Sequence, residues 1–462
     1  MHSRKTTDTI AAIATAMSSS GIGIVRISGS DAITIADQIF KSKKAGKTLR
    51  EVPTHTIHYG VIQDGAEVLD EVLAVVMRGP HSYTAEDTVE IDCHGGVLMM
   101  KKILETVIKY GARPAEPGEF TRRAFLNGRI DLSQAEAVMD VINSSNEYAM
   151  KSSVSQLKGS VSRKVKKLRE DILYQIAYIE SALDDPEHIS LDGYEEELLK
   201  VLEPMIADVE HLVRSADNGK IVSEGIKTVI LGKPNAGKSS LMNVLVGEER
   251  AIVTDIAGTT RDTLEEQIRL QGITLNVIDT AGIRETEDVV EKIGVSRAKT
   301  MADEADLIIY VVDGSCPLDE NDAMIMELIR DRKAVVLLNK TDLEMVVSQE
   351  ELAAKTGQPV IAISAKEETG IEQLEQTIQG MFYEGKLDFN DEIMITNVRH
   401  KTALSDTLAS LKMVRQSIYD GMPEDFLTID LMDAYEQLGS IIGEAVEDDL
   451  VNEIFRKFCT GK

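Results

Sequence analysis

The pattern of apolar and polar positions changes along the chain, and residues 1–120 differ from the rest. Short strand-like runs rich in apolar and β-branched residues occur there at 22–27, 56–62, 72–77 and 88–93. Such runs, bounded by turn signals, are typical of strands that have one buried face. We therefore expect a compact α+β domain over residues 1–122.

The run at 88–94 separates its side chains by chemistry. Its apolar residues share one face and its polar residues share the other; the two sets are Val89, Ile91 and Cys93, and Glu90, Asp92 and His94. The pair Gly95-Gly96 and a helix-like segment follow. The polar face is either a binding site or a solvated sheet surface, and alternation alone does not decide between them.

Two other segments have the periodicity of long helices. Apolar residues recur at intervals of three and four in both; they are Val161, Val165, Leu168, Ile172, Ile176, Ile179 and Leu183 in the first, and Leu404, Leu408, Leu411, Val414 and Ile418 in the second. This spacing gives a helix one apolar face, which needs a partner. Because neither flank is self-sufficient, we expect one discontinuous helical domain, formed by 123–222 and 384–462, with the residues between them inserted as a further domain.

The inserted segment, residues 223–383, has the order of a phosphate-binding domain. A strand-like run at 227–231 leads into Gly-Lys-Pro-Asn-Ala-Gly-Lys-Ser at 232–239, and a helix-like run follows. Glycines let successive backbone amides point at phosphates, while Lys238 would reach the outer phosphates and the Ser239 hydroxyl would bind Mg²⁺. Chance alone gives such a turn in about one chain in a hundred, so the prediction depends on further motifs.

Four further motifs follow in the order found in Ras-like GTPases. They are Thr254-Asp-Ile-Ala-Gly258-Thr259-Thr260, which we call the first switch, Asp279-Thr280-Ala281-Gly282, which we call the second switch, Asn339-Lys340-Thr341-Asp342 and Ser364-Ala365-Lys366. Thr260 would bind Mg²⁺ and sense the γ-phosphate, and Asp279 would hold Mg²⁺ through water. Asp342 would accept both donors on the edge of guanine, a match that discriminates against adenine by about 10⁴ to 10⁵.

These motifs together predict a Ras-like α/β P-loop domain that binds and hydrolyses GTP. The predicted GTP contacts are Asn235, Ala236, Gly237, Lys238, Ser239, Ser240, Thr254, Asp255, Ile256, Ala257, Gly258, Thr259, Thr260, Asp279, Thr280, Ala281, Gly282, Asn339, Lys340, Asp342, Ser364, Ala365 and Lys366. The predicted Mg²⁺ ligands are Ser239 and Thr260.

Hydrolysis requires a group that orients the attacking water. Ras-type enzymes place a glutamine directly after the second-switch glycine, but this chain has Ile283 there, and its side chain cannot hydrogen-bond water. The polar group must come from elsewhere in the chain or from a partner. The nearby candidates are Glu291, Glu285, Arg284 and Arg261. The sequence alone does not choose among them.

Asn235 lies inside the phosphate loop, where its side-chain oxygen can help to bind a monovalent cation. Such a cation would neutralise developing charge as an arginine finger does, an effect of about 10³ to 10⁵ in rate. The asparagine can equally serve to stabilise the turn, and its spacing leaves the two interpretations even.

Length, net charge and cysteine content limit the number of domains, the binding partners and the cellular compartment that we expect. A chain of 462 residues is too long for one core and suggests about three domains. Its formal net charge of −28 repels RNA phosphates unless a local basic patch or a partner intervenes, so we expect any work on RNA to be shared. Three widely spaced cysteines favour a reducing cytoplasm over a disulfide framework or a zinc site. We expect neither a membrane span nor a secretion signal.

Several segments together resemble the family of tRNA uridine-modification GTPases called MnmE or TrmE. They are Gly21-Ile-Gly-Ile-Val-Arg-Ile-Ser-Gly29, His94-Gly-Gly96, the stretch 113–136 and the terminal Phe458-Cys459-Thr460-Gly461-Lys462. The stretch 113–136 is long and unusual, which makes it nearly diagnostic beside an inserted GTPase domain. The likeness extends over the whole chain.

The resemblance implies an N-terminal domain similar to folate-binding aminomethyltransferase domains. In the family this domain binds a formyl- or methylene-tetrahydrofolate and forms the homodimer contact. The positions that match folate-contacting residues are Arg26, Glu90, Arg129 and Lys462. Cys459 matches the terminal cysteine, a candidate modification-site residue, although it could also be a small buried hydrophobe. Thr460 stands where the family's Cys-Ile-Gly-Lys motif has isoleucine.

The resemblance also implies how GTP is hydrolysed and what the reaction serves. Family members use K⁺ and pair two G domains face to face; the matching K⁺ positions are Asn235, Thr254, Ile256 and Thr259. Glu291 matches the residue that positions water. A flavin-containing partner similar to MnmG (GidA) joins the complex, which attaches an aminomethyl or carboxymethylaminomethyl group to C5 of the wobble uridine of certain tRNAs.

Two alternatives remain at this point. A ribosome-assembly or RNA-chaperoning GTPase would explain the nucleotide motifs, but it leaves the stretch 113–136 unexplained and predicts a basic RNA-binding module. A folate-dependent aminomethyltransferase with a vestigial G domain requires inactive switches. The key nucleotide-binding residues are nevertheless all present; they are Lys238, Ser239, Thr260, Asp279 and Asp342.

Overall fold

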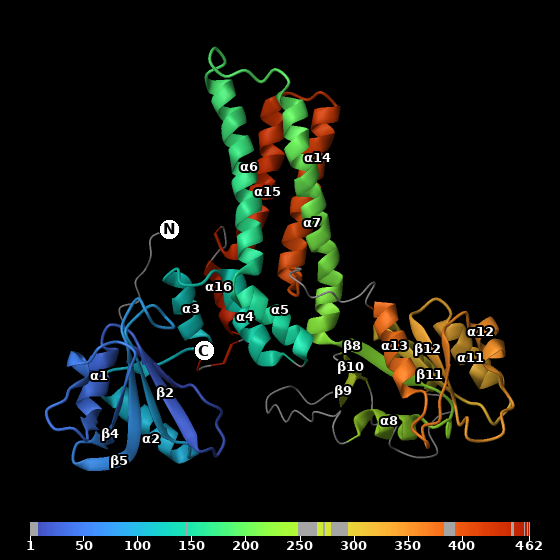
Figure 1. Ribbon diagram of the computed structural model, residues 1–462, viewed down its shortest axis with the longest axis horizontal. Helices are drawn as coiled ribbons and strands as arrows, with labels where there is room; N and C mark the ends of the chain where they lie inside the picture. The colour runs from blue at the N-terminus through green and yellow to red at the C-terminus, as the bar shows by residue number, and fades with distance from the viewer. Residues whose placement is uncertain are drawn as a thin grey trace. The chain divides into compact units, whose positions relative to one another are not determined.

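A computed structural model describes residues 8–144, 146–247, 266–270, 273–278, 294–382, 393–444, 448–456, 458–459 and 461. The chain forms two compact units (Figure 1). Unit 1 consists of Met1–Ile142, Ser155–Leu199 and Ala409–Lys462, and unit 2 of Asn143–Val154 and Lys200–Leu408. None of the helices in the described part of the chain is long and apolar enough to cross a membrane.

Unit 1 begins with a seven-stranded sheet in the order β3-β4-β5-β6-β2-β1-β7. The strands are β1 Ile10–Ile13, β2 Ile22–Ser28, β3 Phe40–Ser42, β4 Thr56–Asp64, β5 Glu67–Met77, β6 Thr88–His94 and β7 Arg113–Pro114. Neighbours are antiparallel except β1 and β7. The helical segments are α1 Ala32–Ile39, η1 Leu49–Glu51 and α2 Val97–Lys109. The four predicted strand runs correspond to β2, β4, β5 and β6.

The two faces of this sheet differ. One face packs on α1 and α2, and the apolar set of β6 is buried there. On the other face the β4–β5 hairpin leaves Ile57, Tyr59 and Leu73 exposed, with Tyr59 and Leu73 paired across the strands. Arg26 of β2 and Glu90 of β6 occupy paired positions. The alternation predicted for 88–94 is therefore present, because its apolar residues are buried and its polar residues are not.

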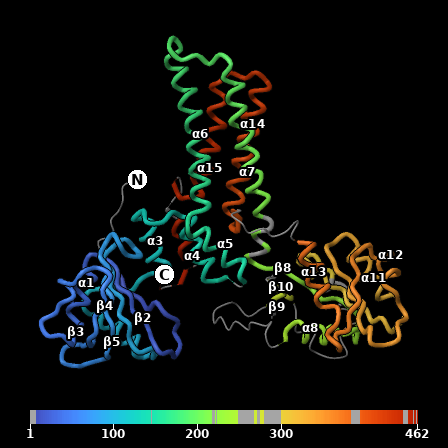
Figure 2. Tube along the Cα trace, in the orientation of Figure 1, coloured from blue at the N-terminus to red at the C-terminus, as the bar shows by residue number. Residues whose placement is uncertain are grey.

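The helices of unit 1 come from both ends of the chain. They are α3 Glu119–Leu126, α4 Leu132–Asn143, α6 Ser160–Asp184, α15 Glu424–Ile442 and α16 Asp448–Arg456, whereas α5 Glu147–Leu157, α7 Tyr194–Glu224 and α14 Val398–Tyr419 extend across the unit boundary. Helices α6 and α15 pack along each other (Figure 2). Arg169 of α6 stacks on Tyr435 of α15, 4.0 Å from the ring centroid, and contacts Glu444.

The predicted apolar face of α6 is buried from Val161 to Ile179. The prediction is wrong at Leu183, whose exposed fraction is 47%. This residue lies in the last turn, one position before the helix ends at Asp184. In the second segment Leu404, Leu411, Val414 and Ile418 are buried and Leu408 is half-buried.

Unit 2 contains a six-stranded sheet in the order β13-β12-β11-β8-β10-β9. The strands are β8 Ile226–Leu231, β9 Glu266–Leu270, β10 Ile273–Val277, β11 Leu307–Asp313, β12 Ala334–Asn339 and β13 Val360–Ala362. All pairs are parallel except β9 with β10. The helices are α8 Lys238–Val246, α10 Gly294–Glu304, α11 Glu320–Ile329, α12 Gln349–Thr356 and α13 Ile371–Phe382. Both faces are apolar and covered, as in doubly wound folds, whose ligands bind at the carboxyl ends of the strands.

Candidate functional sites

The phosphate loop connects β8 to α8, and close neighbours explain its glycines. Gly237 has a φ of +101°, and a Cβ there would lie 2.1 Å from the Asn339 amide nitrogen. Gly232 has a φ of +153°, and its Cβ would lie 2.4 Å from the Val311 carbonyl oxygen. A side chain at position 232 would collide with the backbone of β11, and one at position 237 would displace the Asn339 amide, so glycine suits both positions.

Asn235 is exposed and has a φ of +62°. Asparagine is several-fold enriched in this left-handed region, where most side chains are strained. The backbone therefore supplies one reason for asparagine at this position, in agreement with the turn interpretation. Its predicted role in binding K⁺ stays a prediction.

Lys238 folds back over the loop. Its ammonium group donates hydrogen bonds to the carbonyl oxygens of Gly232 and Lys233, each at 2.7 Å. Burial lowers the pKa of Lys238, and no carboxylate contacts it among the described residues. A half-buried cation without a counter-ion favours an anionic ligand, since the anion would stabilise the charged form.

Asn339 and Ser364 link the three loops that end β8, β12 and β13. The Asn339 amide donates to the Ala236 carbonyl oxygen at 2.9 Å, and its Oδ1 accepts from the Ala365 amide at 3.1 Å. The Ser364 hydroxyl donates to Asp342 Oδ1 at 2.7 Å. This bond is the main cause that lowers the pKa of Asp342. The carboxylate is therefore oriented and ionised, as an acceptor for a base edge must be.

The other described residues of the predicted nucleotide site lie around these loops. Lys340 has a φ of +64° and pairs with Asp313 at 2.6 Å. Lys366 Nζ lies 3.9 Å from Asp342 Oδ2. Ser239 and Ser240 are exposed in the first turn of α8.

The remaining predicted site residues belong to the two switch loops and to the chain's end. They are Thr254, Asp255, Ile256, Ala257, Gly258, Thr259, Thr260, Asp279, Thr280, Ala281, Gly282, Glu291 and Lys462. All of them lie outside the described residues, so their roles stay predictions.

In unit 1 the structure brings together Arg26, Glu90 and Arg129, three of the predicted folate-binding residues. Arg26 Nε donates to Glu90 Oε1 at 2.7 Å. The Arg26 guanidinium lies 5.4 Å from the ring centroid of Tyr83 and 5.5 Å from that of Phe120, within cation–π range. The Arg129 guanidinium lies 4.7 Å from the Tyr83 ring. We call these five residues the Arg26 cluster.

Sequence reasoning did not assign Tyr83 or Phe120 to this site. Tyr83 lies in the loop between β5 and β6 and donates to or accepts from the Thr121 hydroxyl at 2.8 Å. Phe120 is fully buried at the start of α3. Phe120 falls within the stretch 113–136, but no spacing signal marked Tyr83.

Asp92 also faces this side of the sheet, two residues from Glu90. Its Oδ1 is buried and has no hydrogen-bond partner among the described residues. Burial, and then the neighbouring Glu90, raise the pKa of Asp92. An orphaned buried acceptor beside Glu90 favours a ligand that brings hydrogen-bond donors.

Cys459 and Gly461, near the end of the chain, contact the same region. Arg26 Nη1 donates to the Gly461 carbonyl oxygen at 3.1 Å, and a Cβ on Gly461 would lie 2.6 Å from the Ile13 carbonyl oxygen. The Gly118 amide donates to the Cys459 carbonyl oxygen at 3.2 Å. The glycine of the terminal motif is thus required by close packing, and Cys459 is exposed.

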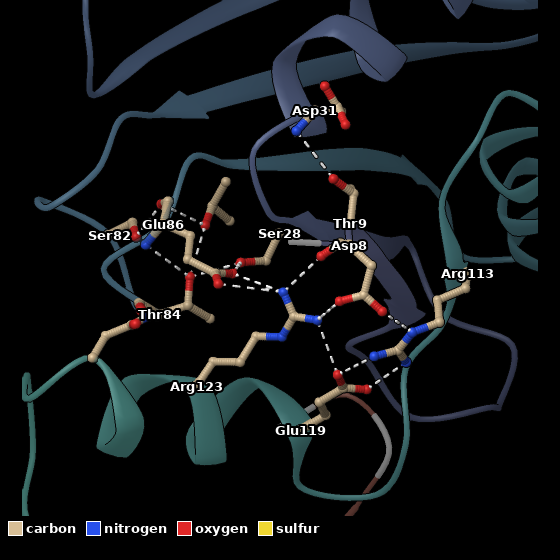
Figure 3. Close-up of polar contacts among 12 residues, drawn as sticks. Asp8, Thr9, Ser28, Asp31, Ser82, Thr84, Glu86, Arg113, Glu119 and Arg123 are labelled. Carbon is tan, nitrogen blue, oxygen red and sulfur yellow. Dashed lines mark hydrogen bonds and ion pairs between the residues drawn. The ribbon is translucent and has the colours of Figure 1, made fainter. Parts of the chain in front are cut away.

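A charge network around the buried Arg123 links α3 to other segments of the N-terminal domain (Figure 3). Arg123 has an exposed fraction of 1% and bonds to Asp8 and Glu119, at 2.9 and 3.0 Å, and to Glu86 at 3.1 Å. Arg113 holds the other side of Glu119, at 2.5 and 2.8 Å. Burial alone would raise the pKa of Glu119, but the two arginines lower it. Three charged residues of the stretch 113–136 therefore serve to position α3.

Two family models match the chain. The MnmE helical domain matches residues 132–459, and the GTP-binding protein TrmE N-terminus matches residues 9–129. A tRNA modification GTPase MnmE from Lachnoclostridium phytofermentans is 59% identical over 99% of this chain and 100% of its own length. Proteins of the same name from Alkaliphilus metalliredigens and Bacillus subtilis are 49% and 46% identical over 98% of this chain and 99% and 100% of their own lengths. The chain therefore belongs to the family of the tRNA modification GTPase MnmE.

Proposed function

We propose that the chain is a K⁺-stimulated GTPase that takes part in adding an aminomethyl or carboxymethylaminomethyl group to C5 of the wobble uridine of certain tRNAs. It acts with a flavin-dependent partner similar to MnmG and uses a tetrahydrofolate as one-carbon donor. The likeness over almost the whole length to relatives named tRNA modification GTPase carries this proposal. The phosphate loop and the Arg26 cluster add the chemistry that a GTP site and a folate site need.

The phosphate loop is the proposed binding site of GTP. The Lys238 ammonium exchanges loop carbonyls for the outer phosphates, and the Asp342 carboxylate, oriented by Ser364, reads the guanine edge. Ser239 and Thr260 would hold Mg²⁺, which neutralises phosphate charge when it is bound. Ser239 lies beside Lys238 in the first turn of α8, the position that a Mg²⁺ ligand of a P-loop requires.

Water activation is assigned to Glu291, since the position after Gly282 is isoleucine. Potassium would be held by the Asn235 side chain and by the first switch loop; the residues of that loop are Thr254, Ile256 and Thr259. Asn235 is exposed on the phosphate loop, so a cation and a second G domain can reach it. A cation there compensates charge that develops in the transition state.

The Arg26 cluster is the proposed folate site. The free oxygen of Glu90 and the orphaned Asp92 Oδ1 can accept the donors on the edge of a pterin ring. The Tyr83 ring offers an aromatic face to the ligand. The Arg26 and Arg129 guanidinium groups suit the carboxylates of the glutamate tail. The bound folate supplies the one-carbon unit, and these residues would orient it.

The exposed apolar residues of the β4–β5 hairpin support a homodimer through the N-terminal domain, where they would be covered.

All three cysteines are free, which agrees with a cytoplasmic location. The net charge of −28 agrees with RNA contact being shared with the partner. A ribosome-assembly GTPase remains the alternative, but it gives no reason for the Arg26 cluster.

Hydrolysis of GTP by the purified full chain in K⁺ and in Na⁺, at equal ionic strength and constant Mg²⁺, tests the proposal. We expect strong activation by K⁺, and we expect Glu291→Ala to lose nearly all turnover while it keeps its GTP affinity. Mass analysis of the wobble nucleoside after incubation with the partner, folate, GTP and tRNA then tests the modification. Equal rates in both salts would return Asn235 to a structural role and favour the assembly GTPase.

A further inference from the structure

Unit 1 contains a cavity of about 450 Å³ between the segment that leads into α3 and helix α16. Glu116 and Arg122 line one side, and Asn452, Phe455 and Arg456 line the other. The volume lies in the range of small-ligand sites, about 300 to 1,000 Å³. It is larger than a bare inorganic anion needs.

The arginines of the cavity are weakly paired. Arg456 is exposed and forms no ion pair with any described residue, and the Asn452 amide has no hydrogen-bond partner among them. Arg122 forms an ion pair with the exposed Glu116, but at 3.9 Å the two groups are too far apart for a hydrogen bond. The hydrogen-bond donors of two guanidinium groups and one amide are therefore available to a ligand.

The second carboxylate in the wall does not cancel these charges. Glu119 accepts hydrogen bonds on both oxygens from Arg113, and a further one from Arg123. Its charge is thus compensated by two arginines that do not line the cavity (Figure 3). Glu116, which is largely exposed, is the remaining acceptor. A fitting ligand combines an anionic group for the arginines with a hydroxyl or N–H donor for Glu116.

We infer that this cavity binds one nucleotide of an RNA strand, with the phosphodiester on Arg122 and Arg456 and the ribose hydroxyl on Glu116. Arginine side chains bind phosphate in a fork geometry, and the ribose hydroxyl supplies a donor for Glu116 that a phosphodiester itself does not carry. In a chain of net charge −28, this cavity offers an RNA phosphate two arginines, and Arg456 forms no ion pair with a described residue. The inference rests on the proposed function for the identity of the RNA, a tRNA.

The position of the cavity suits that role. The loop between Glu116 and Glu119 is bonded to the chain's end, through the Gly118 amide and the Cys459 carbonyl oxygen. Two residues further, the Gly461 carbonyl accepts from Arg26 of the proposed folate site. One wall of the cavity is therefore joined by a hydrogen bond to the terminal segment that contacts the proposed folate site.

Binding of a fluorescent substrate tRNA to the full chain, across a series of salt concentrations, tests the inference. We expect Arg122→Met with Arg456→Met to weaken binding by about tenfold at 0.1 M salt. The slope of log K against log salt should fall in magnitude by about 0.7, the value for one phosphate contact in a single strand. Arg330→Met, which removes the exposed arginine that directly follows α11 in unit 2, is the matched control and should change neither quantity.

K⁺-stimulated GTP hydrolysis and tetrahydrofolate binding should be unchanged in the double variant, so that lost RNA binding is not lost folding. The inference is overturned if the unmodified chain does not bind tRNA, if the control loses as much affinity, or if millimolar inorganic phosphate displaces the RNA at constant ionic strength. Unchanged tRNA affinity with weaker binding of the flavin partner would assign the cavity to a protein. Absence of K⁺-stimulated hydrolysis in the unmodified chain would instead contradict the proposed function.

Discussion

Backbone conformation determines the geometry of the phosphate loop, whereas charged side chains determine that of the Arg26 cluster. In the loop the backbone sets the site, because Gly237 adopts a left-handed conformation and the Asn339 amide occupies the space where a Cβ would lie. In the cluster charged side chains set the site, because Arg26 is held by Glu90 and by the Gly461 carbonyl. The network around Arg123, which contacts Asp8 and Glu86, is likewise formed by charged side chains.

The difference implies different responses to mutation. Where the backbone forms a site, most side chains around it can change without loss of the fold, and a base-reading side chain affects selectivity alone. Where charges form a site, removal of one partner leaves another buried and uncompensated, which destabilises the fold. We expect substitutions in unit 2 to change ligand preference and substitutions in the network of unit 1 to change stability.

The largest effect should come from Asp342→Asn. An amide cannot accept both donors on the guanine edge, so the preference for GTP over ATP should fall by about 10⁴. Competition binding with GTP, ATP and ITP, which lacks the exocyclic amino donor, measures this preference. Lys355→Met removes an exposed lysine of α12 that is not among the predicted GTP contacts, and it is the control. Unchanged selectivity in Asp342→Asn would contradict the base-reading role.

The next effect concerns stability and compares two adjacent arginines. Arg123→Met leaves Glu86 without its ion-pair partner, whereas Asp8 and Glu119 keep Arg113, and it should lower the stability of unit 1 by about 3 kcal/mol. Arg122→Met removes a cation without a close partner and should change it by about 0.5 kcal/mol or less. Urea unfolding followed by a probe in unit 1 measures both, because the multidomain chain need not unfold in one step. Equal losses would show that the network is not the support of α3.

These two residues also show what the sequence can and cannot predict. Contiguous signals predicted the strands, the glycine loop at 232–239 and the guanine-reading motif, since periodicity and φ requirements act within a few residues. Nothing in the sequence separates Arg122 from Arg123, because their pairing depends on Asp8 and Glu86, which tertiary structure brings to α3. Tyr83 was missed for the same reason.

At Leu183 the periodicity continued into the last turn of α6, where Ala182 is the buried residue and Leu183 is exposed. A repeat in the sequence reports which residues share a helix face. It does not report which of two neighbouring apolar residues is covered at the end of the helix. For this reason the ends of elements were less predictable than their existence.

A smaller effect is expected at the cluster itself. Arg26→Met removes the bond to Glu90, the bond to the Gly461 carbonyl and the cation over Tyr83, so tetrahydrofolate should bind at least about tenfold more weakly, a loss of roughly 1.4 kcal/mol. Calorimetric titration of the full chain measures this affinity. Lys43→Met, which removes an exposed ion pair at the β3 end of the sheet, is the control. Unchanged affinity would place folate elsewhere.

The smallest predicted effect tests the contrast between a backbone-determined loop and a charge-determined cluster. An ion pair also contacts the phosphate loop. Lys233 Nζ lies 2.6 Å from Asp322 and 3.0 Å from Asp319, the two residues of the capping box that begins α11. Asp322 is 1% exposed and also accepts from the Tyr310 hydroxyl at 2.7 Å. The loop is therefore tied to a helix by a buried carboxylate as well as shaped by its glycines.

Lys233→Met should separate the two contributions. Asp322 keeps its hydrogen bond from Tyr310 but loses its counter-ion, so we expect KM for GTP to rise a few-fold with kcat nearly unchanged, together with a lower stability of unit 2. Steady-state kinetics and urea unfolding measure these quantities, with Lys227→Met on β8 as the control. If KM does not move, the glycines and Asn339 suffice to hold the loop. If kcat falls as well, the ion pair is needed for the geometry of the transition state, and the loop depends on side-chain charge as the Arg26 cluster does.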